Sequence, residues 1–364
     1  MRSKNVHHLE QLQEDHCWQV FRKHAFQDDN PELNAELKEI GMKIVKKCKG
    51  LPLALKTIGS LLHTNSSVSK WESLSHLPAH LKRCFAFCAL FPKDYSFTKE
   101  SLIELWMAEN FLQCHQQRKC PEEVGEQYFD DLLSRSFFQQ SRLFVMHDLL
   151  NDLAKYICGD TCYRLGVDEA KSISERTCHF SFSMNHVQYL DGFGSLYDAK
   201  RLPIFVPIIT EMGCYFSWHC GKWIKELLSK FKFLSVLSLP GCSGLTEVPD
   251  FVGNLKHLCS LDLSSTDIIK LPDSMCSLYN LQILKLNWCE HLKELPSNLE
   301  KLTNLRRLEF LDSGVREVPI HLGKLKNLHV LSSSYVGKSS EFGIQQLGEL
   351  NLRGSLSIEE LQYI

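Results

Sequence analysis

The segment Leu281-Gln-Ile-Leu284-Lys-Leu286 has the pattern L-x-x-L-x-L, and this pattern returns through the C-terminal third of the chain. Its copies start at Leu234, Leu258, Leu281, Leu305 and, in a degraded form, Leu328. The starting leucines are 24, 23, 24 and 23 residues apart. Two further markers keep the same phase: a Val-Pro or Leu-Pro pair ending at Pro249, Pro272, Pro296 or Pro319, and a second leucine three residues before each later start. Three markers in phase over four steps indicate a tandem structural repeat.

A repeat of this length with this leucine spacing predicts a leucine-rich-repeat solenoid, in which stacked copies share one continuous core. The L-x-L part of each copy is expected to form a strand whose residues alternate between core and surface. A small inward residue, eight after each starting leucine, is expected to satisfy backbone groups where the chain turns the corner. These corner residues are Cys242, Thr266, Cys289, Ser313 and Val336.

Outward-facing strand residues are expected to line the concave surface of the solenoid, and we take them as candidate partner-binding residues. They are Val236, Ser238, Ser260, Asp262, Ile283, Lys285, Arg307 and Glu309. Both signs of charge occur among them, which favours a protein partner over a nucleic acid. The alternative is a solvated face without a partner, because exposed strand residues must be polar in any case.

Composition limits the classes of protein to consider. The 364 residues carry a formal net charge of −2, and 23% of them are charged, which argues against a general polyanion binder. The longest apolar run, 202–209, is far shorter than the roughly 20 residues of a membrane helix. No apolar signal core follows the N-terminus. We therefore expect a cytoplasmic protein whose fifteen cysteines are reduced thiols.

The first 158 residues are helical by pattern. Helices are expected over 15–26 and 31–49, with a third opening at Pro52, and then over 81–90, 98–111, 121–135 and 148–158. A small hairpin, 137–140 and 143–146, precedes the last helix, so residues 77–158 resemble a winged-helix domain. Such domains often bind DNA, but the helix that would enter the groove carries Glu100, Glu104 and Glu109 and would be repelled by phosphates.

Four motifs in order resemble those of the plant NB-ARC leucine-rich-repeat disease-resistance proteins of the coiled-coil, non-TIR type. The first is the block from Leu9 to Phe26. The second, 50–54, reads GLPLA; the third, 81–95, reads LKRCFAFCALFPKDY; the fourth, 146–148, reads MHD. Repeats follow them, so the similarity covers nearly the whole chain.

This resemblance implies an ADP-bound switch whose helical and winged-helix subdomains close over the nucleotide. Pro52 would pack beside the adenine, His147 would reach the β-phosphate, and Asp148 would help to hold the off state. The alternatives are a first-turn proline for Pro52 and an ordinary residue between wing and helix for His147. The family role is pathogen perception and defence signalling: the repeats contact the NB-ARC part within the chain and bind a pathogen effector or a guarded host protein.

The phosphate-binding motif of that family is not in the sequence. No G-x-x-x-x-G-K-[ST] occurs, because Gly337-Lys338-Ser339 has Ser332 where the first glycine should be. The family's acidic metal motif is missing as well, since Asp130-Asp131 falls within a predicted helix. The short gap after 2–6, which resembles the end of another family motif, predicts a deleted segment. We therefore expect an N-terminally truncated receptor, no enzyme activity and weak or undetectable ADP binding.

The predicted fold class is α+β and multidomain. A helical ARC1-like part is expected at 1–65, a winged-helix ARC2-like part at 66–165, a linker or irregular early repeats at 166–230, and an α/β repeat solenoid at 231–364. Cys214, His219 and Cys220 resemble metal ligands, but no second pair of matching spacing supports a zinc site. The alternative function is a non-signalling protein-interaction module or the product of a decaying gene. No metal, nucleic acid or transmembrane segment is expected.

Overall fold

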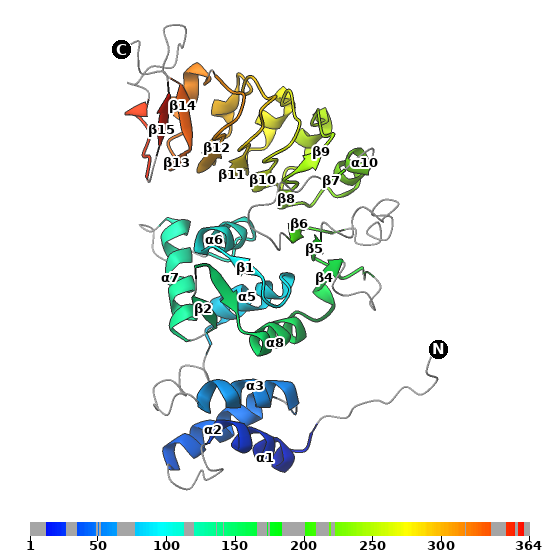
Figure 1. Cartoon of the computed structure of the whole chain (residues 1–364), viewed down its shortest axis with the longest axis vertical. Coiled ribbons are helices and arrows are strands. Elements are labelled where there is room, and N and C mark those ends of the chain that lie inside the picture. Colours follow the sequence, from blue (N-terminus) through cyan, green and yellow to red (C-terminus); the bar gives the residue numbers. More distant parts are fainter. Residues whose placement is uncertain are drawn as a thin grey trace. The chain divides into compact units, whose positions relative to one another are not determined.

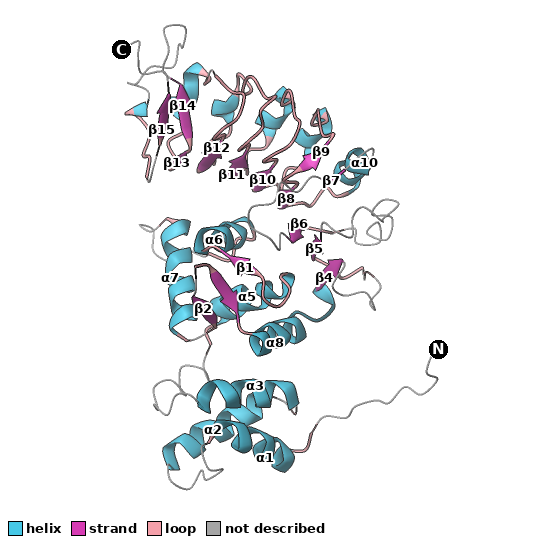
Figure 2. Ribbon diagram, viewed as in Figure 1, coloured by secondary structure: helices cyan, strands magenta, loops and turns pink. Residues whose placement is uncertain are grey.

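The computed structural model describes most of the chain and divides it into two compact units. The described residues are 12–26, 35–48, 50, 52–63, 77–112, 120–135, 137–140, 142–165, 173, 175–183, 201–208, 218–219, 223–316, 318–335, 347–353 and 356–359. The first unit, here called the helical unit, comprises Met1–Lys99 and Leu112–Gly159. The second, the repeat unit, comprises Glu100–Phe111 and Asp160–Ile364. Figures 1 and 2 show the elements of each.

Three helices open the helical unit: α1 (Glu14–Ala25), α2 (Ala35–Lys47) and α3 (Pro52–His63). Acidic residues occupy the first turn of α1 and basic residues its last turn, as the helix dipole favours. The apolar faces of the three helices meet in one core around Phe21 and Leu55, both fully buried. Gly41 is required there, because a Cβ atom would lie 2.9 Å from Cε1 of Phe21. The three predicted helices are confirmed, although 27–34, where the second was expected to begin, lies outside the described residues.

The winged-helix fold of the same unit is also confirmed. It contains α5 (Ala79–Phe87), η3 (Cys88–Leu90), α7 (Pro121–Ser134), and α8 (Asp148–Cys158). The predicted hairpin is β2 (Phe138–Gln140) paired antiparallel with β3 (Phe144–Met146). A third strand, β1 (Ser96–Phe97), pairs with β3 and was not predicted. The ring centroids of Phe129 and Phe138 lie 5.1 Å apart, so aromatic packing fixes the wing on α7.

The repeat unit is built on one parallel sheet of eight strands in the order β13-β12-β11-β10-β8-β6-β5-β4. The leucine pattern accounts for five of them: β8 (Val236–Ser238), β10 (Ser260–Asp262), β11 (Ile283–Lys285), β12 (Arg307–Glu309) and β13 (Val330–Leu331). The other three are β4 (Cys162–Leu165), β5 (His179–Ser183) and β6 (Ile204–Ile208). The strands in 166–230 are therefore early strands of the repeat sheet rather than a linker. This sheet also begins before residue 166.

Short elements complete the repeat unit. The first is α6 (Lys99–Ala108), which belongs to this unit from Glu100 onward. Helix α10 (Trp223–Lys230) precedes the first clear repeat, and the short helices η6 (Asp250–Asn254), η7 (Asp273–Ser277), η8 (Leu299–Lys301) and η9 (Ile320–Lys324) return the chain after each strand. Two small parallel pairs join β7 (Trp218–His219) to β9 (Cys242–Ser243), and β14 (Ser333–Tyr335) to β15 (Ser357–Glu359). The remaining element, η4 (Gly159–Thr161), leads into β4.

Side chains at fixed positions of the repeat bond one copy to the next. The starting leucines 234, 258, 281, 305 and 328 are fully buried. At the corner, Thr266 Oγ1 donates to the Leu263 carbonyl at 2.7 Å and Cys289 Sγ donates to the same oxygen at 3.1 Å, which confirms the predicted role of these residues. Before the strands, Asn280 Nδ2 donates to the Lys256 carbonyl at 2.8 Å. Asn304 and Asn327 repeat this bond one and two copies later.

Beyond the end of each of four strands, one residue adopts the left-handed backbone conformation, with a positive φ angle. These stacked residues are Gly241 (φ 67°), Ser265 (57°), Trp288 (57°) and Asp312 (52°). The backbone N–H groups of the first three donate to carbonyls of the next copy; that of Trp288, for example, donates to the Leu311 carbonyl at 2.8 Å. Glycine and small polar residues tolerate this conformation, whereas a bulky tryptophan is unusual there.

The cysteines differ from the sequence expectation. Nine of those in the described parts of the chain are free thiols, but Cys158, Cys162 and Cys242 are disulfide-bonded. Burial raises the pKa of the Cys84 thiol to about 12 and that of Cys259 to about 11, so these thiols are protonated and inert core residues. Among the described helices, none is long and apolar enough to cross a membrane.

Candidate functional site

A cluster of charges joins helix α6 to the concave strand residues of the repeat unit. Lys285 Nζ lies 2.6 Å from Glu104 Oε2, and Arg307 Nε lies 3.0 Å from Glu104 Oε1. The exposed fractions of the three side chains are 12% for Glu104, 22% for Lys285 and 25% for Arg307. One carboxylate therefore accepts bonds from two cations that are separated from it by about 180 to 200 residues, in a site largely shielded from water.

A second carboxylate closes this cluster from the strand side. Arg307 donates from its terminal nitrogen to Glu309 Oε1 at 2.9 Å, and Asn287 Nδ2 donates to Glu309 Oε2 at 2.8 Å. Burial by itself would raise the pKa of Glu309, but Lys285 and these donors outweigh it and lower the pKa below its usual range. Burial would likewise lower the pKa of Lys285, yet Glu104, Asp262 and Glu309 raise it. Lys285 and Glu309 are consequently charged at neutral pH.

A second acidic residue, Glu109 directly after α6, also contacts the strands of the repeat unit. The Ser235 hydroxyl lies 2.6 Å from Glu109 Oε1, and His179 Nε2 lies 3.4 Å from Glu109 Oε2. Ser235 directly precedes strand β8 and His179 begins β5, so Glu109 links two strands of the same sheet that lie on either side of β6. Together, Glu104 and Glu109 connect α6 to residues from four strands or their edges.

The predicted partner-binding residues fall into two groups in the structure. Val236, Ser260 and Ile283 are buried, with exposed fractions of 1%, 9% and 1%. The residues two positions later in the strands are partly exposed, and so is Arg307. They are Ser238, Asp262, Lys285 and Glu309. Asp262 accepts a bond from the Ser264 N–H at 3.0 Å and stabilises the strand end. Binding of a partner by these residues stays a prediction.

The contacts of Glu104 and Glu109 were not predicted from the sequence. The signal was nevertheless present, because the acidic residues of this helix predict a partner other than DNA. What the sequence did not contain was the position of α6 relative to Lys285 and Arg307. The carboxylates of one helix and the cations of a distant strand face are separate observations in the sequence, and the structure joins them.

The residues that the resemblance assigns to the nucleotide lie at the ends of two helices of the helical unit. Pro52 is the exposed first residue of α3. His147 is partly exposed, and its carbonyl accepts the N–H groups of Leu150 and Asn151 at 2.9 and 3.0 Å. Asp148 is the exposed first residue of α8. Helices α3 and α8 pack against each other, with Leu153 of α8 on the α1–α3 core.

These three residues fit only part of a nucleotide site. Pro52 offers an apolar ring and His147 an imidazole, whereas the Asp148 carboxylate would repel a phosphate placed at the start of α8. A phosphate cradle needs a run of backbone N–H groups or several cations. The residues present supply neither, so we derive no chemical step through a nucleotide.

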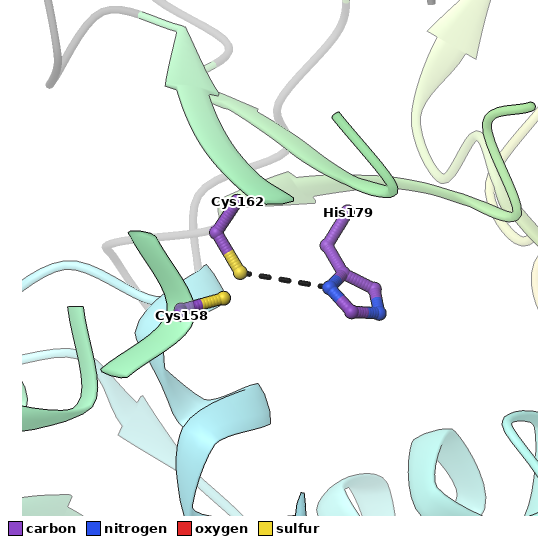
Figure 3. A group of neighbouring side chains, drawn as sticks. All are labelled: Cys158, Cys162 and His179. Carbon is purple, nitrogen blue, oxygen red and sulfur yellow. Dashed lines mark hydrogen bonds between the residues drawn. The ribbon is translucent and has the colours of Figure 1, made fainter. Parts of the chain in front are cut away.

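A further group, Cys162 and His179, has the chemistry of metal ligands. Cys162 Sγ lies 3.6 Å from His179 Nδ1, and Figure 3 draws both together with Cys158 at the end of α8. Cys158 and Cys162 each have their sulfur in a disulfide, whereas a metal needs free thiolates. Cys214 and Cys220, which were considered in the sequence as ligands, lie outside the described residues. This group therefore carries no metal assignment.

Comparison with known proteins identifies both parts of the chain. Residues 90–154 match the disease resistance protein winged helix domain, and residues 215–359 match a leucine-rich repeat region. The leucine-rich repeat domain of the type III effector XopL covers 79% of this chain at 13% identity, but its TM-score of 0.35 is too low to support an argument.

Curated relatives agree with these matches. A putative disease resistance protein of Arabidopsis thaliana is 40% identical over 388 aligned positions, covering 100% of this chain and 27% of that protein. The putative disease resistance RPP13-like protein 1 of the same plant is 37% identical, covering 78% of this chain and 29% of that protein. Disease resistance protein RGA2 of Solanum bulbocastanum is 33% identical, covering 71% and 26%. The chain spans less than a third of the length of each, and it belongs to the plant disease-resistance proteins that combine a winged-helix domain with leucine-rich repeats.

Proposed function

We propose that the chain is the regulatory part of an intracellular plant immune receptor, in which the repeats hold helix α6 of the winged-helix domain in place. The observation that carries this proposal is the position of Glu104. Its carboxylate bonds both Lys285 and Arg307 in a shielded site, so separation of α6 from the repeats would break two charge-assisted bonds at once.

The partner in this proposal is a pathogen effector or a guarded host protein. A ligand that reaches Lys285 and Arg307 must compete with Glu104 for the same cations. Ligand binding and α6 docking therefore oppose each other. Each weakens the other by the same coupling free energy. A partner that supplies an acidic group at this point would release α6, and released α6 is the signal that the rest of the receptor reads.

Nucleotide binding is a weaker element of the proposal. Pro52 and His147 would form the lid side of an ADP site, with the phosphate cradle supplied by sequence that this chain does not contain. We expect no ATP hydrolysis and weak or undetectable ADP binding by the chain. Isothermal titration with ADP and Mg²⁺ tests this expectation, and magnesium-dependent binding in the micromolar range would contradict it.

A cell-death assay in leaf tissue tests the proposed role. The chain is expressed with Glu104→Lys, which places a cation against Lys285 and Arg307, and with Glu100→Lys, an exposed position on the same helix, as the matched control. We expect electrolyte leakage to rise severalfold with Glu104→Lys only. Equal leakage from both variants would contradict the proposed role of this contact.

The alternative is a non-signalling interaction module, favoured by the missing phosphate-binding motif. It predicts no leakage from any variant while the concave surface still binds its partner. Under this alternative, Glu104→Lys would weaken or strengthen partner binding without any cellular response. A tagged chain that does not accumulate in the cytoplasm would argue against both functions.

A further inference from the structure

The two residues before each starting leucine form a surface strip that is separate from the concave face, and we call it the entry rim. Its members are Lys232-Phe233, Lys256-His257, Tyr279-Asn280, Thr303-Asn304 and Lys326-Asn327. None of these ten residues is acidic, and three are lysines. Lys326 is paired with Glu349 at 3.1 Å, so the positive charge of the strip lies at Lys232 and Lys256.

Three consecutive copies of the rim present aromatic rings to solvent. Phe233 is 49% exposed and Tyr279 is 53% exposed. The rings of Phe233 and His257 stack with centroids 5.5 Å apart, and Lys256 Nζ lies 5.9 Å from the centre of the Tyr279 ring. Lys256 is itself fixed, because Nζ donates to the carbonyl and the hydroxyl of Ser277 at 3.1 and 3.0 Å. The strip is therefore a pre-ordered alternation of rings and cations.

The aromatic residues are not required by the repeat. The residue directly before the starting leucine is asparagine in the third, fourth and fifth copies, where its amide bonds the previous copy. In the first two copies Phe233 and His257 replace it, so no asparagine amide can bond the previous copy there. Replacement of a structural hydrogen bond by an exposed ring is the kind of local conflict that function explains. Half-exposed phenylalanine and tyrosine beside lysine are also typical of binding surfaces.

We propose that the entry rim around Phe233, Lys256, His257 and Tyr279 binds an acidic polypeptide segment carrying an aromatic or aliphatic anchor. The positive charge of the rim selects carboxylates, and the two exposed rings bury the anchor. A protein segment is favoured over a nucleic acid because the cations are few and interleaved with rings, and Lys256 is already engaged by Ser277. Nucleic acids gain most of their affinity from many phosphate contacts. This surface is distinct from the concave cluster in which Glu104 lies.

Fluorescence anisotropy with the whole chain tests this proposal. The probe is a fluorescein-labelled random copolymer of glutamate and tyrosine, compared with a lysine–tyrosine copolymer and a labelled single-stranded oligonucleotide. The test variant is Phe233→Ser with Tyr279→Ser. The control is Trp288→Ser, which removes an equally exposed ring (53%) from the other end of a strand. Circular dichroism confirms that each variant is folded.

We expect the chain to bind the glutamate–tyrosine copolymer, and the double variant to bind it about tenfold more weakly, while Trp288→Ser leaves binding within about twofold. Lys232→Glu should also weaken binding. Four outcomes would overturn the proposal: no binding of the copolymer, an equal loss with Trp288→Ser, equal affinity for the lysine copolymer, or tighter binding of the oligonucleotide. The last would reassign the rim to nucleic acids. None of these outcomes depends on Glu104, so failure here leaves the proposed function standing.

Discussion

The helical unit and the repeat unit hold their candidate residues in opposite ways. In the helical unit, Pro52 and Asp148 are exposed first residues of helices, where only a bound ligand would engage them. In the repeat unit, Glu104 bonds Lys285 and Arg307, and Arg307 also bonds Glu309, at distances of 2.6 to 3.0 Å. The first set lies at exposed helix starts, whereas the second is held together by bonds within the repeat unit.

This difference has an energetic consequence. Exposed residues that only a ligand would contact can be replaced at little cost to stability. Replacing one of several charged residues that neutralise one another in a shielded site lowers the stability of the fold. The following changes are ordered by the size of the expected effect on the unfolding free energy, and each would sharpen or break this distinction.

Leu284→Ala should have the largest effect. Leu284 is fully buried in the central repeat, and its removal leaves a cavity that the adjacent strands β10 and β12 cannot fill. We expect a loss of about 3 kcal/mol, measured by urea unfolding of the repeat unit. Ile269→Ala, at a position that is 55% exposed, is the control and should cost less than about 0.5 kcal/mol. Similar losses for both would mean that the repeats do not share a continuous core.

Glu104→Ala should follow. It leaves Lys285 and Arg307 facing one another without the shared carboxylate, and we expect a loss of about 2 kcal/mol. Side-chain exposures of 12–25% place the cluster between the surface and interior cases. Glu100→Ala on the same helix should cost almost nothing. If the two variants unfold at the same temperature, the charge of Glu104 does not hold α6 on the repeats.

The Glu309 contribution should depend on pH in a predictable direction. Its folded pKa lies below the usual value of 4.5, so its stabilisation is fully present above that value and is lost as pH falls through the folded pKa. Lys285 has a raised pKa, so its contribution persists below 10.5 and is lost as pH rises further. The stability difference between wild type and Glu309→Gln should be constant from about pH 5 to 10 and shrink toward pH 3. A difference that grows on acidification would reverse the assigned sign.

Asn280→Ala should have a smaller effect. It removes the 2.8 Å bond from its amide to the Lys256 carbonyl and leaves that oxygen to water, at a cost of about 1 kcal/mol. Asn304→Ala, which removes the equivalent bond one copy later, should give the same value within error. Thermal unfolding of both variants measures these losses. Clearly unequal losses would show that equivalent asparagine bonds do not stabilise successive copies equally.

Pro52→Ala should have the smallest effect. A first-turn proline contributes only a fixed φ angle to α3, so we expect a change within about 0.5 kcal/mol in the melting of the helical unit. A larger loss would show that Pro52 supports the fold and is not a residue reserved for a ligand.

Much of the fold could be predicted from local pattern. The leucine spacing gave the register of β8 and β10–β13 because one periodic core repeats the same constraint in each copy. The leucine pattern did not predict strands β5 and β6, because Phe180, Phe182 and Phe205 take the place of leucine there. The rings of Phe180 and Phe205 lie 5.5 Å apart. Strand β1 has only two residues, too few for a period to appear.

The candidate site was less accessible to sequence reasoning. Lys285 and Arg307 lie in the strand register that the repeat predicts, but the bond from Lys285 to Glu104 spans 181 residues. No local periodicity reports a contact of that range, because it depends on how whole elements dock. The sequence shows that α6 is acidic, but it does not show that Lys285 and Arg307 are the cations it contacts.

The most direct test of the account is a double-mutant cycle between Glu104 and Arg307. Hydrogen exchange of the α6 backbone amides is measured for wild type, Glu104→Gln, Arg307→Gln and the double variant, which gives the local opening free energy of the helix in each. We predict that the two losses are coupled by about 1–3 kcal/mol, because each variant removes the same shared bond. Losses that add within about 0.5 kcal/mol would show that α6 is not held on the repeats by this carboxylate, and would contradict the proposed function.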